Sequence, residues 1–381
     1  MRQNGEWGRG NAELKTGHSA IRIPHSALKG AVTYHSSGVD IEAADAWLAR
    51  MRPLIRSTRS PRVLADRGQF GGLFSLAGLG MREPVLVAST DGAGTKLKLA
   101  QLMEPEGRSP ERPPRLRSAK PSGGGSRGTG AHEAIGVDVV AMNTNDVLVY
   151  GATPLFFLDY LAVGRIQRPL MSALLRGIVR GCRESGCALL GGETAEMPGV
   201  YRNGEYDAAG FCVGVVERAR LIDGSQVRAG DAVVGLASSG VHANGFSLVR
   251  KVFSTAELRR RARTLLTPTR IYVKPVLAAL RTVPIRAIAH VTGGGLARRL
   301  PSLVSARAGL TVRVQPGSWS VPVIFRDIQR AGRISDEEMA RTFNLGIGMV
   351  LVCRPGDQEG LKSLMCRAGV PAWSIGTIER N

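Results

Sequence analysis

The sequence is poor in aromatic residues and cysteine, and it contains no long hydrophobic run. Aromatic residues make up only 5% of its 381 residues, which excludes the interleaved aromatic and basic residues of a stacking platform for single-stranded nucleic acid. The five cysteines form no CxxC pair, so we expect reduced, buried thiols and a cytoplasmic protein. No apolar stretch approaches the length of a membrane span, and the N-terminus lacks the apolar core of a secretion signal.

Basic residues outnumber acidic ones, and the formal net charge is +20. The excess is spread along the chain rather than gathered in one tail, and its densest patch is Arg259-Arg260-Arg261 with Arg263. No aromatic residues alternate with that patch. We therefore expect no specific nucleic-acid partner, although the charge favours phosphorylated substrates.

The length and the 43% apolar content predict two globular domains. Strands alternate with helices in both halves, which predicts an α/β or α+β class. The predicted parts are a mobile N-terminal tail (1–33), a first domain (34–216) that contains a disordered Pro-, Arg- and Gly-rich insertion (104–131), and a second domain (217–381). Apolar spacing predicts helices at 40–56, 169–187, 243–252 and 269–280, and strands at 187–190, 208–216, 231–236, 285–290 and 345–352.

The most informative segment is 85–100, where a β-branched apolar run ends at Asp91-Gly92-Ala93-Gly94-Thr95-Lys96 and a short helical pattern follows. This order is typical of a strand that ends in a polyphosphate site. Asp91 can bind Mg²⁺, Gly92 and Gly94 let backbone N–H groups approach an anion, and Lys96 supplies a positive charge. By itself the segment is equally consistent with a Gly-rich turn and a solvated lysine.

Two further segments favour the phosphate interpretation. Residues 132–154 form an apolar helical pattern that carries Asp138, Asn143, Asn145 and Asp146, although buried Asp residues are rare without a partner. Asp146 can act as a metal ligand or as a helix cap, and Asp138 can have either of these two roles.

In the third segment an apolar strand ends at Gly191-Gly192-Glu193-Thr194. We expect three strand ends to bring Asp91, Asp146 and Glu193 together as a site for a divalent metal and a nucleotide phosphate.

At this point the motifs resemble those of the aminoimidazole ribonucleotide synthetase family, also called phosphoribosylformylglycinamidine cyclo-ligases. The similarity covers nearly everything from Tyr34 onward, and the matching segments follow the family's order. These segments are 91–100, 145–160, 191–199, 206–211, 238–248, 289–295 and 341–348.

The resemblance implies an ATP-dependent closure of formylglycinamidine ribonucleotide to 5-aminoimidazole ribonucleotide through an iminophosphate, with ATP and Mg²⁺ as cofactors. It also implies two domains with central sheets flanked by helices, and a homodimer whose N-terminal sheets associate. No membrane partner is implied.

The candidate site residues follow from the motifs and the resemblance together. Lys96, His242 and His290 are catalytic candidates, and each histidine is equally consistent with a merely packed side chain. Gly293-Gly294-Gly295 is a candidate site for the ribose 5′-phosphate. The nucleotide and metal candidates are Gly71, Asp91, Gly92, Gly94, Thr95, Lys96, Asn145, Asp146, Gly191, Gly192, Glu193 and Thr194, of which Asp91, Asp146 and Glu193 are the metal ligands.

One segment departs from the family's pattern. The glycine-rich loop expected to cover the nucleotide is 65–72 here, with fewer glycines and an added Asp66-Arg67 pair. Related ATP-using families fit less well: a selenophosphate synthetase needs a reactive residue near its start, where no cysteine precedes Cys182, and a hydrogenase-maturation relative ends in cysteine, whereas this chain ends in Asn381. A non-catalytic scaffold that keeps the fold remains the alternative of a different class.

Overall fold

The computed structural model describes residues 41–64, 72–104, 127–304 and 309–381. The predicted tail, Gly71 and most of the predicted insertion lie outside these residues. At the C-terminal end of the insertion the prediction of disorder is wrong, because residues 127–131 form the start of a long helix, α3.

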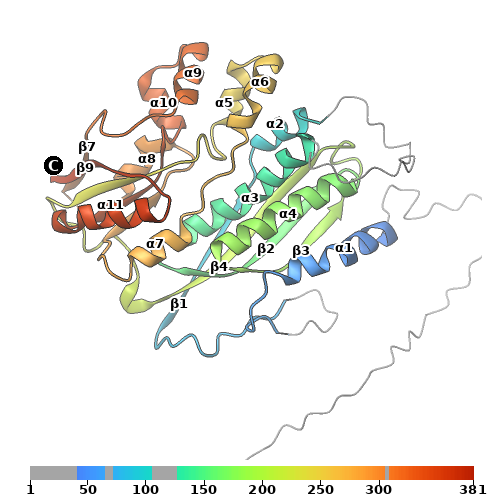
Figure 1. The fold of residues 1–381 in the computed structure, drawn as a ribbon, viewed down its shortest axis with the longest axis horizontal. Coiled ribbons are helices and arrows are strands. Elements are labelled where there is room, and N and C mark those ends of the chain that lie inside the picture. The colour runs from blue at the N-terminus through green and yellow to red at the C-terminus, as the bar shows by residue number, and fades with distance from the viewer. Residues whose placement is uncertain (1–40, 65–71, 105–126, 305–308) are drawn as a thin grey trace, which may run out of the picture.

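The first sheet holds four strands in the order β1-β4-β2-β3 (Figure 1). Strands β2 and β3 pair in parallel, and the other pairs are antiparallel. Its elements are α1 (Ile41–Arg56), β1 (Pro84–Gly92), α2 (Lys96–Leu102), α3 (Arg127–Leu148), β2 (Thr153–Val163), α4 (Arg168–Ser185), β3 (Ala188–Glu196) and β4 (Tyr206–Glu217).

The second sheet holds five antiparallel strands in the order β6-β8-β5-β9-β7. Its two central strands, β5 and β8, are buried at every position, as expected for strands covered on both faces. The elements are β5 (Ala232–Ala237), α5 (Phe246–Val252), α6 (Thr255–Leu265), α7 (Val273–Ala279), β6 (Ala287–His290), α8 (Gly295–Ser302), β7 (Leu310–Val314), α9 (Val323–Gly332), α10 (Asp336–Thr342), β8 (Ile347–Cys353), α11 (Gln358–Arg367) and β9 (Ala372–Arg380).

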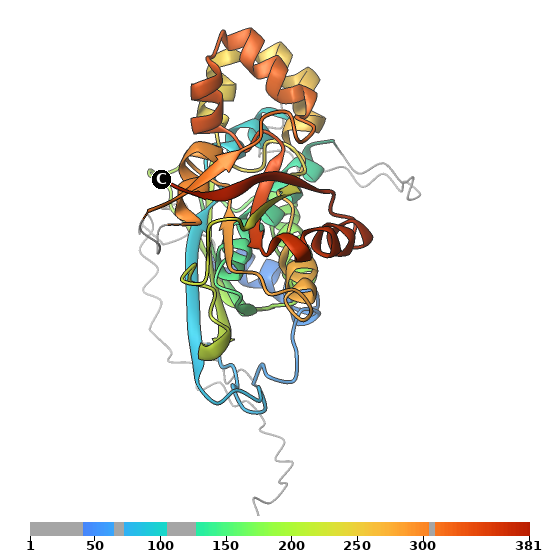
Figure 2. The same cartoon turned by 90° about the vertical axis from the view of Figure 1, so that its left-hand side faces the viewer.

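The architecture agrees with the predicted class of two sheets flanked by helices, and Figure 2 shows helices α5, α6, α9 and α10 projecting at one end of the molecule. The observed bounds of α1, α4, α5 and α7 lie within a few residues of the helices predicted from the sequence. Strand β3 is longer than predicted and continues through Glu196, so Glu193 lies inside the strand rather than at its end. Asp146 lies in the last turn of α3 and not at a strand end, which corrects the second of the three expected strand ends.

Helices α3 and α4 cross one face of the first sheet in very close contact (Figure 1). A Cβ at Gly136 would lie 2.1 Å from the Leu174 carbonyl oxygen, and one at Gly177 would lie 2.0 Å from that of Glu133. Only glycine permits this approach of the two backbones. The position of α3, which carries four of the polar candidate residues, is therefore tightly fixed.

The opposite face of the first sheet leaves large apolar side chains exposed. Leu86 on β1 is 57% exposed and Phe211 on β4 is 46% exposed. Exposed apolar residues that share a sheet face are typical of a surface that packs against another molecule.

Candidate active site

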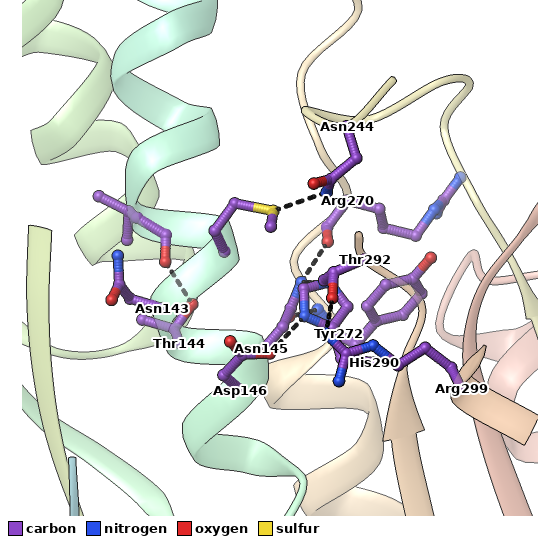
Figure 3. A network of polar contacts seen from close by, with 12 residues as sticks. Asn143, Thr144, Asn145, Asp146, Asn244, Arg270, Tyr272, His290, Thr292 and Arg299 are labelled. Carbon is purple, nitrogen blue, oxygen red and sulfur yellow. Dashed lines mark hydrogen bonds and ion pairs between the residues drawn. The ribbon is translucent and has the colours of Figure 1, made fainter. Parts of the chain in front are cut away.

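The C-terminal half of α3 meets the second domain through a hydrogen-bond network (Figure 3). Asn145 is fully buried. Its Nδ2 donates to the Arg270 carbonyl oxygen at 2.9 Å, and its Oδ1 accepts the Tyr272 N–H at 2.9 Å. Both ends of the amide are thus used to join the two domains. The side chain that sequence reasoning assigned to phosphate has an interdomain role here.

Asp146 and His290 form the next contact along α3. His290 is buried, and its Nδ1 lies 2.8 Å from Asp146 Oδ1, so this nitrogen carries the proton that it donates to the carboxylate. Its Nε2 faces Asn145 Nδ2 at 3.4 Å. With both ring nitrogens engaged, His290 holds the Asp146 carboxylate in place, as a supporting partner does for a ligand carboxylate.

Asp91 lies at the end of β1, beside α3. Asn143 donates from Nδ2 to the Asp91 carbonyl oxygen at 3.3 Å and to Val139 O at 2.8 Å. Burial raises the pKa of Asp91 above its ordinary value, and the nearby Asp146 carboxylate raises it further; the Gly92 N–H, His290 and Arg299 act in the opposite direction. Asp91 and Asp146 thus repel each other electrostatically, which favours a cation near both.

Arg299, on α8, reaches this space from the second domain. It donates to the Thr292 hydroxyl oxygen, while its Nε–H is buried without a partner among the described residues. Figure 3 shows its side chain running from α8 back toward Thr292 and His290. The arginine thus brings a positive charge toward Asp91 and Asp146.

Lys96 occupies a different, closed cluster. Its side chain is fully buried, and its Nζ lies 2.8 Å from Asp138 Oδ2 and donates to the Thr267 carbonyl oxygen at 2.8 Å. Asp138 Oδ1 accepts both the N–H and the hydroxyl of Thr269 at 2.7 Å. Burial lowers the pKa of Lys96, and Asp138 opposes this. The ammonium group expected on a phosphate instead pairs with a carboxylate between the two domains.

His242 is buried in a strained turn. Its φ of +65° lies in the left-handed region, which is unfavourable for a residue with a side chain. Nε2 accepts the Ser239 N–H at 3.1 Å, and Nδ1 has no partner among the described residues. Burial lowers the pKa of His242 well below its ordinary value, with nearby cationic groups adding to the effect. The ring is therefore neutral at pH 7, with its proton on Nδ1.

Glu193 does not join Asp91 and Asp146. In the sheet register Asp91 lies opposite Gly210, Gly210 opposite Asp159, and Asp159 opposite Gly192. Asp91 and the neighbour of Glu193 are thus three strands apart, or about 14 Å at the usual strand spacing. One ion cannot contact both carboxylates, and only an extended ligand spans that distance. The expected convergence of three carboxylates on one cation is wrong within this chain.

The residues around Glu193 line a separate cavity of about 690 Å³ between α1, β2 and β3, a volume typical of small-molecule sites. Asp159 lies in its wall, and burial raises the pKa of this carboxyl to about 7. A Cβ at Gly192 would lie 2.3 Å from Asp159 Oδ1, so the strand needs glycine there. The cavity lining includes the candidates Gly191, Gly192, Glu193 and Thr194 together with Trp47, Arg56 and Arg59.

The turn between β1 and α2 contains the remaining candidates. Gly94 has a φ of +61°, which requires glycine, and a Cβ at Gly92 would lie 3.5 Å from the Ala208 carbonyl oxygen. The Thr95 hydroxyl lies 3.0 Å from that of Ser247 on α5, so it also contacts the second domain. The backbone of this turn is open beside Asp91.

The donor set at Asp91 and Asp146 fits a magnesium ion. Mg²⁺ in phosphate sites takes one or two carboxylates and completes its shell with water and substrate phosphate. Asn143 Oδ1 is buried without a partner among the described residues, and it adds a further oxygen beside Asp91. Within the described part of the chain no three His, Cys, Asp or Glu side chains gather as a complete metal site.

Sequence reasoning missed Arg299 and Thr292 in this site. No signal for Arg299 was present in the sequence, because it lies in the last turn of α8, where a cation is electrostatically favourable and needs no further explanation.

Residues 118–216 match the family described as AIR synthase related protein, N-terminal domain, and residues 228–381 match the corresponding C-terminal domain. The model contains no described helix with the length and apolar character needed to cross a bilayer.

Solved structures with similar folds include a thiamine-monophosphate kinase from Stenotrophomonas maltophilia, with a TM-score of 0.60 and 18% identity, covering 88% of this chain and 94% of that one. The hydrogenase maturation protein HypE in complex with ATP has a TM-score of 0.59 and 17% identity, covering 87% and 86%. At these identities the likeness concerns the fold alone.

Two relatives resemble the chain far more closely. Phosphoribosylformylglycinamidine cyclo-ligase of Gloeobacter violaceus is 47% identical over 91% of this chain and 97% of the relative. That of Syntrophus aciditrophicus is 44% identical over 91% and 95%. By these matches along nearly its whole length, the chain belongs to the aminoimidazole ribonucleotide (AIR) synthase family.

Proposed function

We propose that this protein is a phosphoribosylformylglycinamidine cyclo-ligase, which closes formylglycinamidine ribonucleotide to 5-aminoimidazole ribonucleotide in purine biosynthesis with ATP as the phosphoryl donor. The observation that carries the proposal is the paired Asp91 and Asp146 carboxylates between the two domains, facing a guanidinium group, in a chain of this family. Carboxylates, a cation and an open glycine turn are what a phosphoryl-transfer site requires.

The chemistry proceeds in two steps. The formamide oxygen attacks the γ-phosphorus, and the bond from phosphorus to the ADP oxygen breaks, which gives an iminophosphate. The amidine nitrogen then attacks the activated carbon, and the carbon–oxygen bond breaks to release phosphate. The first step converts a poor leaving group into a good one, so the protein's task is to position the two substrates and neutralise charge.

The residues divide this task between them. Asp91 and Asp146 would hold Mg²⁺, which would supply positive charge to the triphosphate oxygens, and His290 keeps Asp146 in place. The Gly92 N–H donates to Asp91 Oδ1 at 2.8 Å, so the turn at Gly94 and Thr95 is the part that offers backbone N–H groups to phosphate. Neutral His242, with its unpartnered Nδ1–H, is a hydrogen-bond donor for a substrate oxygen.

The cavity at Gly191 to Thr194 receives the rest of the nucleotide. This cavity lies three strands from Asp91. An extended nucleotide can span that distance, whereas a single ion cannot. The arginines Arg56 and Arg59 in its lining add positive charge for an anionic ligand.

We also infer that the exposed apolar face of the first sheet binds a second copy of the chain. Leu86 and Phe211 lie on that face, and a homodimer covers them. A Leu86→Glu variant is expected to sediment as a monomer where the wild-type protein sediments as a dimer. Monomeric wild-type protein would contradict this inference without touching the reaction.

The function is tested by incubating the protein with ATP, Mg²⁺ and formylglycinamidine ribonucleotide, and by measuring ADP and aminoimidazole ribonucleotide together. We expect equal amounts of both products, and no ADP when thiamine monophosphate replaces the substrate. ADP release without the ribonucleotide product, or only with thiamine monophosphate, would refute the proposed function.

A further inference from the structure

The turn from β6 into α8 directs one arginine back toward the carboxylates. Gly294 and Gly295 have φ values of +91° and +58°, which let the helix begin three residues after Thr292. A Cβ at Gly295 would lie 2.2 Å from the Ala340 carbonyl oxygen, so the start of α8 is pressed against α10. Arg299 follows one turn later and bonds back to Thr292. Its guanidinium group is therefore held by the fold and does not move freely in solvent.

The guanidinium group of Arg299 has an N–H donor that makes no hydrogen bond among the described residues. Thr292 Oγ1 accepts from one Nη, while the buried Nε–H has no partner in the part of the chain that the structure describes. A buried donor without an acceptor is costly, and it is a sign of a missing ligand. Figure 3 shows the Arg299 side chain reaching toward Thr292 and His290, and His290 Nδ1 lies 2.8 Å from Asp146 Oδ1, so the guanidinium group lies on the side of the carboxylates.

The other nearby cations are committed elsewhere. Lys96 is buried against Asp138. Arg270 also has a buried Nε–H without a partner among the described residues, but its Nη1 donates to the Gly369 carbonyl oxygen at 3.1 Å. Figure 3 shows the Arg270 guanidinium turned away from Asp146. His242 is neutral at pH 7. Arg299 is thus left as the cation that faces the carboxylate pair among the described basic residues of this network.

We propose that Arg299 is a catalytic residue that binds oxygens of the phosphoryl group as it passes from ATP to the formamide oxygen. This inference rests on the proposed function. Thr292 fixes one side of the guanidinium, and the Nε–H side donates to the phosphoryl group, on which negative charge is distributed in the transition state. A guanidinium is suited to this because it is always charged and presents its donors in a fixed plane.

The test compares Arg299→Ala with Arg298→Ala. Arg298 is the exposed neighbour of Arg299 on α8, so each variant removes one positive charge from the same helix. We expect kcat to fall about 100- to 1000-fold in Arg299→Ala, as for the loss of one transition-state donor, and less than about twofold in Arg298→Ala. Arg299→Lys should fall between them. Millimolar guanidinium chloride should restore part of the rate of Arg299→Ala only.

A second readout does not depend on the cyclisation. Arg299 is expected to contact the γ-phosphoryl group, so Arg299→Ala should lower the ratio of ATP to ADP affinity in calorimetric titrations, while Arg298→Ala leaves that ratio unchanged. This measurement holds even if the wild-type protein acts on another acceptor, which separates failure of this inference from failure of the proposed function.

A purely structural role for Arg299 makes different predictions. If Arg299 only held the β6–α8 turn, Thr292→Val would reduce kcat as much as Arg299→Ala, and both variants would melt at a lower temperature. That pattern, or an Arg299→Ala variant with the kcat and ATP/ADP ratio of Arg298→Ala, would overturn the proposal. Unchanged melting of Arg299→Ala with guanidinium rescue supports it.

Discussion

Two polar clusters join the domains along α3, and they differ in how far their charges are paired. In the closed cluster, Lys96 forms an ion pair with Asp138 Oδ2, and Asp138 Oδ1 accepts two hydrogen bonds from Thr269. In the open cluster, Asp91 and Asp146 repel each other, and Arg299 keeps a buried Nε–H without a partner among the described residues. Both clusters contain a cation and carboxylates, so residue type alone does not separate them. The satisfied cluster stabilises the fold, and the unsatisfied one is where a ligand belongs.

The largest expected effect is on catalysis, from a change in the open cluster. Asp91→Asn removes one of two proposed metal carboxylates, so we expect kcat to fall at least about 100-fold, measured as ADP release. The fold should be unaffected, because the change relieves repulsion with Asp146. Asp223→Asn, an exposed carboxylate elsewhere, is the matched control. An Asp91→Asn variant with the wild-type rate would refute the metal assignment.

The largest effect on stability is expected in the closed cluster. Lys96→Met leaves Asp138 as a buried, unpaired carboxylate, and this should lower the free energy of unfolding by about 3–5 kcal/mol in urea titrations. Lys98→Met is the control, since Lys98 lies on the same helix in a half-exposed pair with Glu205 and should cost less than about 1 kcal/mol. Equal stability of the two variants would show that the closed cluster is not structural.

A smaller effect is expected at Asn145, which lies between the two clusters. Asn145→Ala leaves the buried Tyr272 N–H without its acceptor, so we expect a loss of about 1–3 kcal/mol in the same titrations. The rate should also fall, because this contact sets the second domain against α3. A variant with normal stability but a large loss of ATP affinity would return Asn145 to the phosphate role predicted from the sequence.

The smallest effect concerns Asp159 in the α1 cavity and depends on pH. Its pKa is about 7 in the folded protein and near 3.8 when unfolded, so the native state binds the extra proton and stability falls as pH rises from about 4 to 7. Asp159→Asn should therefore melt about 2–4 °C above wild type at pH 8, and close to it at pH 4. Equal melting temperatures of Asp159→Asn and wild type at pH 8 would contradict this prediction.

The sequence predicted the elements better than the roles of their polar residues. Apolar spacing located α1 and α4 because amphipathic periodicity is local, whereas the apolar pattern at 132–154 ran past the end of α3 at Leu148 and into β2. The pairing of Lys96 with Asp138 was not predictable in this way, since it joins residues 42 positions apart through a fold that brings the Thr267–Thr269 segment alongside. Polar residues in an apolar helix correctly indicated a special surface, but they did not distinguish a domain contact from a ligand site.

The separation of Glu193 from Asp91 was also beyond sequence reasoning. The segments that carry Asp91, Asp146 and Glu193 have similar patterns in the sequence. Only the strand order of the folded sheet places β3 three positions from β1. Arg299 was missed because its importance depends on a turn at Gly294 and Gly295 whose direction the sequence does not specify.

The continuity of α3 has a mechanical consequence. Asp138 and Asp146 are eight residues apart on one unbroken helix, or about 12 Å along its axis. If the C-terminal domain rotates by about 5° about the buried Lys96–Asp138 contact, groups beside Asp146, about 12 Å away, move by about 1 Å. A shift of that size is enough to change a reaction rate about 100-fold. A small rotation between the two domains would thus change the reaction rate while the Lys96–Asp138 contact stays intact.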